Sequence, residues 1–160
     1  MRRSAAVTML VAALAAGGCG GGGGDDKTVA TTPASTGPLT KAQFIAAADK
    51  VCKMTSDKIS AAAEKLRTAA KKTGTIPVSK VSKFLTQTSL PAYDAMLDQL
   101  RALTPPKDDE KTIDGLIASL AGAIDTAKAD PVKYSKNSAP DPFDDANARA
   151  IKYGMKVCGS

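Results

Sequence analysis

The sequence contains no histidine and no tryptophan, and its aromatic residues are three tyrosines and three phenylalanines. Without histidine the chain cannot carry a Ser-His-Asp or Cys-His catalytic centre, and it cannot bind zinc or haem through imidazole. No stretch shows the two-residue alternation of apolar and polar side chains that is typical of strands. These absences favour an all-helical protein with an alanine-rich core and no cofactor.

The first residues have the pattern of an export signal. Arg2 and Arg3 precede an apolar run over residues 5–16, which is too short to span a membrane as a helix. The segment Ala16–Cys19 (AGGC) resembles the bacterial lipobox, although Ala16 stands where that motif usually has leucine. We therefore predict that residues 1–18 are a lipoprotein signal peptide, and that Cys19 is lipidated with diacylglycerol and palmitate.

An ordinary signal cleaved after Ala13–Ala15 is the alternative to lipidation. In either case, the residues that follow have the composition of a linker. Five glycines run from Gly20 to Gly24, and threonine, proline and charged residues continue without an apolar period. Such a composition predicts a flexible tether over residues 19–39.

The stretch from Leu39 to Gly74 predicts one long helix. Thr40 and Gln43 fit a capping box, and Leu39 and Phe44 fit the hydrophobic staple that accompanies it. Apolar residues then recur with a period of 3.6, and Gly74 suits the left-handed position beyond a helix end. On the polar face, the order of Asp49 and Lys53 predicts an ion pair between residues four apart.

Three further helices are predicted by the same period. An apolar stripe over 78–103 is interrupted by Pro91, which predicts a kink near Thr88 or two shorter helices that meet there. The third helix should begin at Asp108–Glu110 and stop at Asp130-Pro131, followed by an irregular segment over 132–140. The last should begin at Asp141-Pro142 and continue to Gly159.

The cysteines indicate how these helices are closed. If Cys19 carries lipid, Cys52 and Cys158 remain as one pair, and in an oxidising compartment they should be joined. A redox-active pair is disfavoured because no C-x-x-C motif is present. We therefore predict one domain over residues 40–160, an all-α antiparallel four-helix bundle closed by the Cys52–Cys158 disulfide.

Acidic residues gather near the expected start of the last helix. They could bind a metal ion, or they could have a structural role at the helix end. They are Asp130, Asp141, Asp144 and Asp145. Calcium needs six to eight oxygen ligands, and the EF-hand spacing is absent. Acids also favour the positive end of a helix dipole. We therefore predict no metal site, and we assign Asp108–Glu110 to a solvated first turn rather than to acid–base catalysis.

Basic residues gather around the first expected turn between helices. They are Lys65, Arg67, Lys71, Lys72, Lys80 and Lys83. One interpretation is a solubilising surface that also complements a helix dipole. The other is a binding patch for an anionic wall polymer, anionic lipid headgroups or an acidic envelope protein. No motif for nucleic-acid recognition is present, so nucleic acid is not an expected partner.

Three segments together resemble a known group. They are Phe44–Cys52 (FIAAADKVC), Leu103–Pro106 (LTPP) and Tyr153–Gly159 (YGMKVCG). With the lipobox and the tether, they resemble small exported helical lipoproteins of high-GC Gram-positive bacteria. The resemblance implies a helical fold and a place on the outer face of the cell membrane, held by lipid on Cys19, and it implies no activity.

Three functional hypotheses follow. The first is a monomeric, non-catalytic envelope lipoprotein that binds another envelope protein or a wall polymer. The second is a small-molecule carrier, which would require an apolar cavity of roughly 300 Å³ or more between the helices. We expect such a cavity to be lined by Leu85, Met96, Leu116 and Ile151. The third and least favoured is an enzyme that uses carboxylate, lysine or tyrosine side chains converging in a cleft.

Overall fold

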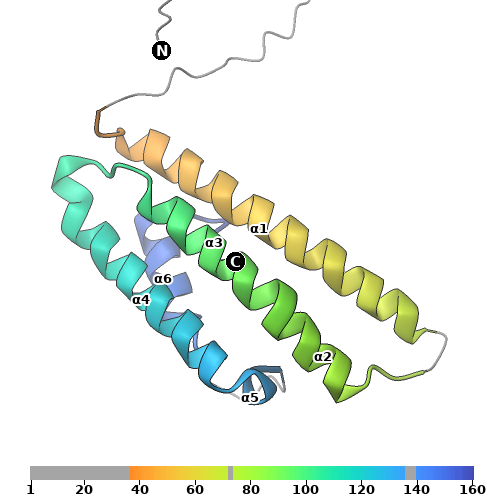
Figure 1. Cartoon of the computed structure of the whole chain (residues 1–160). Coiled ribbons are helices and arrows are strands. Elements are labelled where there is room, and N and C mark those ends of the chain that lie inside the picture. Colours follow the sequence, from red (N-terminus) through yellow and green to blue (C-terminus); the bar gives the residue numbers. More distant parts are fainter. Residues whose placement is uncertain (1–36, 72–73, 136–139) are drawn as a thin grey trace, which may run out of the picture. The chain divides into compact units, whose positions relative to one another are not determined.

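The computed structural model describes residues 37–71, 74–135 and 140–160. Within these residues the chain is helical and contains no strand, which confirms the all-α prediction. The elements are α1 Lys41–Ala70, α2 Val78–Phe84, a π-helical turn Leu85–Ser89, α3 Leu90–Arg101, a 3₁₀ turn Lys107–Asp109, α4 Glu110–Ala129, α5 Pro131–Ser135 and α6 Asp144–Tyr153 (Figure 1).

Several predictions concern residues outside these ranges. The signal peptide over 1–18, nearly all of the tether over 19–39, the lipidation site Cys19 and the basic residue Lys72 lie outside the described residues. None of the described helices is long and apolar enough to cross a membrane.

Local sequence signals account for both ends of α1. The Gln43 N–H donates to the Thr40 hydroxyl at 3.3 Å, and the Thr40 N–H donates to the Gln43 side chain at 2.9 Å. This is the capping box that the sequence predicts, and it satisfies two backbone donors that a helix start leaves unpaired. Beyond the other end, Gly74 has a φ of 76°, a left-handed conformation that glycine adopts without a Cβ clash.

The second apolar stripe forms two helices joined by the π-helical turn. Pro91 has no N–H, and its ring crowds the preceding helical turn. The turn over Leu85–Ser89 accommodates it, with the Leu90 N–H bonded to the Leu85 carbonyl five residues earlier. The interruption includes Thr88, so the prediction of two shorter helices that meet there is confirmed.

The C-terminal part of the chain departs from the prediction in two places. Residues 132–140 were expected to be irregular, but α5 continues to Ser135 because Asp130 accepts a hydrogen bond from the Lys133 N–H at 2.8 Å and caps a short helical turn. The last helix was expected to run from Asp141-Pro142 to Gly159, but α6 begins at Asp144 and ends at Tyr153. Gly154 has a φ of 113° and turns the chain back.

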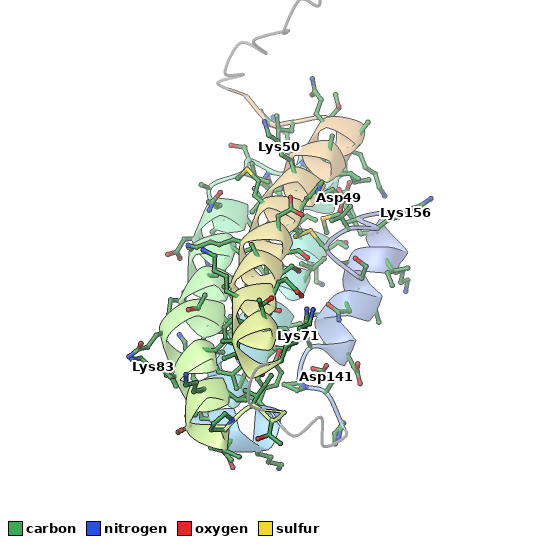
Figure 2. The ribbon with its side chains drawn as sticks, turned by 90° about the vertical axis from the view of Figure 1, so that its right-hand side faces the viewer. Asp49, Lys50, Lys71, Lys83, Asp141 and Lys156 are labelled. Atoms are coloured by element: carbon green, nitrogen blue, oxygen red, sulfur yellow. A yellow bond between two sulfur atoms is a disulfide. The ribbon has the colours of Figure 1, made fainter. Side chains whose placement is uncertain are left out.

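The segment Met155–Ser160 therefore folds back as turns, and it is held to α1. Cys158 forms a disulfide with Cys52 with an S–S distance of 2.04 Å and a Cα–Cα distance of 5.1 Å, which confirms the predicted pairing. The Asp49 carboxylate also accepts hydrogen bonds from the Val157 and Cys158 N–H groups at 3.0 and 3.1 Å (Figure 2).

This use of Asp49 overturns the predicted ion pair with Lys53. Lys53 instead pairs with Asp57 at 2.9 Å, on the exposed face of α1. Both acids lie four residues from Lys53, so local spacing allows either partner. The two N–H groups of the C-terminal segment decide between them, because they engage Asp49.

The helices pack in pairs around the core: α1 packs on α3, α3 on α4, and α4 on α6, which lies behind α3 and α4 in the view of Figure 1. Polar contacts join their ends. The Leu39 N–H donates to the Thr104 carbonyl at 3.2 Å, which links the start of α1 to the end of α3. Lys128 near the end of α4 pairs with Asp94 of α3 at 2.6 Å. The largest fully buried side chains are Phe44, Ile124 and Met155.

Candidate functional site

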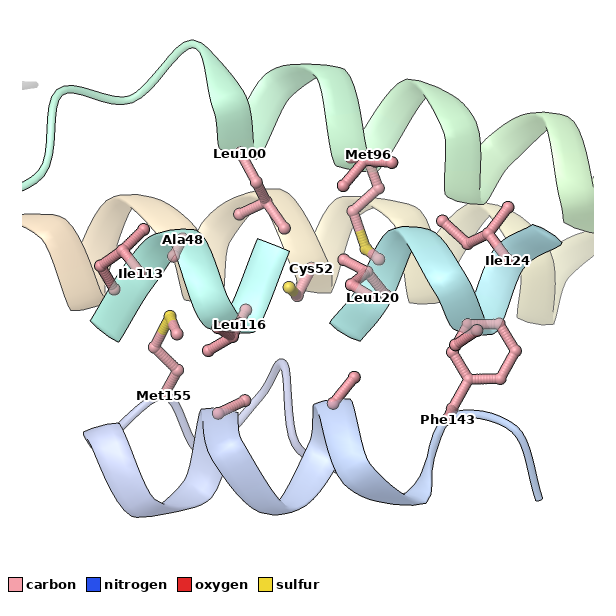
Figure 3. Packing of buried hydrophobic residues seen from close by; sticks show 14 of the residues in the cluster. Ala48, Cys52, Met96, Leu100, Ile113, Leu116, Leu120, Ile124, Phe143 and Met155 are labelled. Atoms are coloured by element: carbon pink, nitrogen blue, oxygen red, sulfur yellow. The ribbon is translucent and has the colours of Figure 1, made fainter. Parts of the chain in front are cut away.

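A cavity of about 300 Å³ lies among α1, α3, α4, α6 and the C-terminal segment. Its lining residues are Phe44, Cys52, Thr55, Ser56, Ile59, Ser60, Tyr93, Met96, Leu100, Ile113, Leu116, Ile117, Leu120, Phe143, Ala146, Asn147, Ala150, Met155, Val157, Cys158 and Ser160. Figure 3 shows part of this lining, with Met96, Leu116, Leu120 and Met155 projecting between the helices. A volume near 300 Å³ is at the lower end of the range for small-molecule sites, roughly 300–1,000 Å³.

Helical spacing explains how α1 and α6 line the cavity. On α1, the lining residues from Cys52 to Ser60 follow one another at alternating intervals of three and one, which places them on one face of the helix. On α6 and the residue before it, Phe143, Ala146, Asn147 and Ala150 follow the same rule. The cavity opens between these two faces, where Ser56, Ser60 and Ser160 are exposed.

No family model, curated protein or solved structure matches this chain.

The polar side chains that line the cavity are uncharged. None of the described residues that line it is an aspartate, glutamate, lysine or arginine. Hydroxyl and amide side chains lie on the side that opens between α1 and α6: Thr55, Ser56, Ser60, Asn147 and Ser160. The opposite walls, from α3 and α4, carry aliphatic side chains, a thioether and one tyrosine. The cavity therefore has an apolar interior and a neutral polar side.

Thr55 is the most deeply placed of these polar groups. It is 7% exposed, and its hydroxyl makes no hydrogen bond within the described residues. A threonine inside a helix commonly bonds to the carbonyl four residues earlier, as Thr126 does with Gly122 at 2.8 Å. Among the described residues, every fully enclosed side-chain oxygen or nitrogen has a hydrogen-bond partner. The Thr55 hydroxyl has none, so it is not fully enclosed, and it is accessible from the cavity that Thr55 lines.

The aromatic rings of Tyr93 and Tyr134 pack against the ring of Phe143. The Phe143 ring lies 5.0 Å from the Tyr93 ring and 5.8 Å from the Tyr134 ring, measured between centroids. Burial raises the pKa of Tyr93 above 10.0, the Tyr134 side chain opposes that shift, and the Asp141 carboxylate adds to it. The Tyr93 hydroxyl is thus neutral at physiological pH, so it adds no charge to the cavity.

The C-terminal segment forms one wall of the cavity. Met155, Val157, Cys158 and Ser160 all line it, and the disulfide holds that wall against α1. The segment also packs closely on α6, because a Cβ added at Gly159 would collide with Ile151. The position of this wall depends on α1, α6 and the disulfide together.

Of the four residues predicted to line the cavity, two do so. Met96 and Leu116 line the cavity, as expected. Leu85 is buried but belongs to the π-helical turn and does not reach it, while Ile151 is 56% exposed on the outer side of α6. Thr55 and Asn147 also line the cavity and were not predicted from the sequence. The available signal was the set of hydroxyl residues within the apolar stripe of α1, where a solid core would place alanine or leucine.

The predicted basic patch spans the end of α1 and the whole of α2. Figure 2 shows Lys71 and Lys83 toward the opposite end of the domain from Lys50. Lys80 lines the same small hollow of about 170 Å³ as the last turn of α1, which joins the two elements. Arg67 differs from the others because it pairs with Glu64 at 3.1 Å. Lys65, Lys71, Lys80 and Lys83 are exposed and form no ion pair within the described residues.

The acidic residues of the C-terminal half have structural contacts. Asp141 accepts a hydrogen bond from the Phe143 N–H at 2.9 Å, just before α6. Asp145 accepts hydrogen bonds from Ser119 at 2.6 Å and from Arg149 at 2.7 Å, and these bonds lower its pKa. Among the described residues, no group of three or more histidine, cysteine, aspartate or glutamate side chains is placed to hold a metal ion.

Proposed function

We propose that the helical domain is a non-catalytic binding domain that holds a small, uncharged, mainly apolar molecule in the cavity between its helices. The observation that carries the proposal is the cavity itself, with a volume of about 300 Å³ and no charged side chain in its described lining. A close-packed core would leave only voids near the size of a water molecule. This function corresponds to the small-molecule carrier predicted from the sequence. It is also compatible with a non-catalytic envelope lipoprotein, whose binding role it would specify.

The lining supports binding rather than catalysis. The two cysteines of the lining, Cys52 and Cys158, are joined in a disulfide and have no free thiol to act as a nucleophile. The remaining polar side chains are hydroxyls and one amide, and none of the described lining residues carries a carboxylate or amine side chain that could act as a general base. Such groups can orient a ligand by hydrogen bonding.

For the topology, we propose an antiparallel four-helix bundle of α1, α3, α4 and α6. In such a bundle, the start of each helix lies beside the end of its neighbour. The bond from Leu39 to Thr104, the ion pair between Lys128 and Asp94, and the bond from Tyr153 to Asp109 each fit that rule. The cavity then lies at the centre of the bundle and opens between its first and last helices.

For the location, we propose that the domain is anchored to the outer face of the cell membrane through lipid on Cys19. The support is the sequence pattern of residues 1–19, with its basic start, apolar run and lipobox-like end. A ligand held by a tethered domain would be kept close to the membrane surface. The protein would then act as a carrier or as an accessory to another envelope protein.

The binding proposal can be tested with naphthalene, which has no polar atom, and with methionine methyl groups as reporters. The full chain carrying Cys19→Ser is labelled with ¹³C at its methionine methyl groups and titrated by NMR. Met96 and Met155 line the cavity, whereas Met54 is 50% exposed on α1. Binding in the cavity should shift the signals of Met96 and Met155 and leave that of Met54 in place. Absence of a shift at Met96 and Met155, or an equal shift at Met54, would overturn the proposal.

A matched pair of variants sharpens this test. Ala146 is 4% exposed on α6 and lines the cavity, so Ala146→Leu should fill part of the space and reduce naphthalene affinity at least tenfold. Filling a cavity commonly stabilises a protein by about 0.5–2 kcal/mol, so the variant should also melt no lower than the parent. Ala118→Leu makes the same change at an exposed position of α4 and should leave affinity unchanged. Equal affinities of the two variants would argue against the cavity as the site.

The basic patch supports a second candidate function, attraction to an anionic wall polymer or an acidic envelope protein. Its support is that Lys65, Lys71, Lys80 and Lys83 form no ion pair within the described residues. Exposed charges act over a Debye length of about 10 Å at 0.1 M salt and about 3 Å at 1 M, so such binding should be lost in high salt. Reversal of Lys71, Lys80 and Lys83 to glutamate should abolish a partner recovered from envelope extract at low salt. Binding that resists both salt and charge reversal would exclude the patch.

A further inference from the structure

The cavity has two chemically distinct sides, and the difference specifies the class of molecule that fits it. Aliphatic and thioether groups of α3, α4 and the C-terminal segment, together with the Tyr93 ring, form the inner walls; among them are Met96, Leu116, Leu120 and Met155. Thr55, Ser56, Ser60 and Asn147 form the side toward the opening. A molecule that satisfies both sides needs an apolar body and a polar end.

Charge restricts the polar end. None of the side chains of the described residues that line the cavity is charged, and an ion taken out of water without a partner charge carries a large desolvation penalty. A carboxylate or an ammonium group would therefore be disfavoured. A neutral hydroxyl can both donate to and accept from the threonine, serine and asparagine groups at this side.

Thr55 supplies an independent observation. Its side chain is 7% exposed, lines the cavity and has no hydrogen-bond partner within the described residues. Because no enclosed side-chain oxygen or nitrogen among the described residues lacks a partner, this hydroxyl is accessible from the cavity and can bond to a molecule held there. A hydroxyl on the ligand would provide that partner at the boundary between the polar and apolar sides.

The volume and the walls restrict the body. An apolar cavity of roughly 150 Å³ holds one benzene molecule, with its six carbon atoms. By the same proportion, about 300 Å³ accommodates on the order of twelve carbon-sized atoms. Met96 and Met155 have flexible, polarizable side chains that adapt to an irregular aliphatic chain.

We infer that the ligand is an uncharged, medium-chain aliphatic amphiphile whose hydroxyl group is bound by Thr55, with its chain between Met96 and Met155. This inference rests on the proposed binding function and narrows it to one ligand class. The alkyl chain is buried against the inner walls, and its hydroxyl is directed toward Ser56, Ser60 and Asn147 at the opening.

The test compares three probes that share a ten-carbon chain: 1-decanol, decanoate and decyltrimethylammonium. Each is titrated at neutral pH into the full chain carrying Cys19→Ser, with the methyl signals of Met96, Met155 and Met54 as reporters. Decanol should bind with at least tenfold higher affinity than either ion, and it should shift Met96 and Met155 but not Met54. Equal or tighter binding of an ion would overturn the inference.

Variants of Thr55 test its hydroxyl. Thr55→Val keeps the shape and removes the hydroxyl, so decanol affinity should fall about fivefold to tenfold, whereas Thr55→Ser should restore most of it. Thr112→Val makes the same change at an exposed position of α4 and should have no effect. Unchanged decanol affinity in Thr55→Val would overturn the role of Thr55.

Naphthalene distinguishes failure of the inference from failure of the proposed function. Thr55→Val should bind naphthalene as tightly as the parent, because naphthalene makes no hydrogen bond to the hydroxyl. If naphthalene binds in the cavity but decanol shows no preference over the ions, the ligand class is wrong and the binding function stands. If neither naphthalene nor decanol shifts Met96 and Met155, both proposals fail.

Discussion

The Asp49 carboxylate accepts a hydrogen bond from the Cys158 backbone N–H at 3.1 Å, between residues 109 positions apart. The same oxygen accepts from the Val157 N–H at 3.0 Å, and the neighbouring disulfide joins Cys158 to Cys52, one helical turn further along α1. One short stretch of α1 thus holds the C-terminal segment through a carboxylate and a covalent bond. Because that segment is a wall of the cavity, these contacts maintain the candidate site.

Removal of the Asp49 carboxylate should destabilise the domain. Asp49→Ala leaves two backbone donors of the C-terminal segment without their partner, which should cost about 1–3 kcal/mol of unfolding free energy. Asp57→Ala is the matched control, because it makes the same change on α1 and removes only the exposed pair with Lys53, worth less than about 1 kcal/mol. Urea unfolding monitored by circular dichroism measures both. Equal losses would show that the Asp49 contacts add nothing to stability.

Loss of the disulfide should lower the free energy of unfolding more than loss of the Asp49 carboxylate does. The bond closes a loop with a sequence separation of 106, for which chain entropy gives a stabilisation of roughly 4–5 kcal/mol. Cys52→Ala combined with Cys158→Ala should lower the urea midpoint accordingly and weaken naphthalene binding, since one cavity wall is released. Cys19→Ser alone should leave the unfolding free energy of the domain unchanged. A double variant as stable as the parent would contradict the account of the C-terminal segment.

The tyrosines predict a loss of stability in alkali. Burial raises the pKa of Tyr153 above 10.0, and its hydrogen bond to Asp109 at 2.7 Å adds to that shift. Burial is also the main cause of the raised pKa values of Tyr93 and Tyr134. The native state therefore retains protons that the unfolded state releases above about pH 10, so stability is fully present below that pH and falls as the pH rises further.

Ultraviolet absorbance at 295 nm measures this titration. The sequence holds three tyrosines, so no other residue contributes a tyrosinate signal. The folded chain should ionise at higher pH than the same chain in 8 M urea, and the transition should coincide with unfolding by circular dichroism. Tyr153→Phe should lessen the alkaline loss of stability. A single folded-state transition near pH 10 would contradict the burial of these hydroxyls.

The Cys19→Ala variant tests the proposed location. One acyl chain gives only marginal membrane binding, and stable anchoring requires more, as the diacylglycerol and palmitate would supply. Loss of the lipid should therefore release the exported domain into the medium, as measured by immunoblotting of cell and culture fractions. Retention of the variant in the membrane would instead support an uncleaved N-terminal helix.

Local signals in the sequence predict the elements of this fold well. The capping box at Thr40 and Gln43 involves residues three positions apart, so its hydrogen bonds depend on little else. The interruption around Pro91 follows from the missing N–H of one residue. The Cys52–Cys158 pairing was predictable because the assignment of Cys19 to lipid left one connectivity.

Tertiary structure decided the end of the last helix, the partner of Lys53 and the site. Gly154 and Gly159 both suit a helix end, and the attachment of Val157 and Cys158 to Asp49 selects Gly154. The cavity likewise depends on how α1 and α6 face each other, because helical periodicity shows which face is apolar but not whether two faces meet. The sequence by itself therefore determined the helices and their covalent link. The space between the helices, with the Thr55 hydroxyl facing into it, arises only when distant segments pack together.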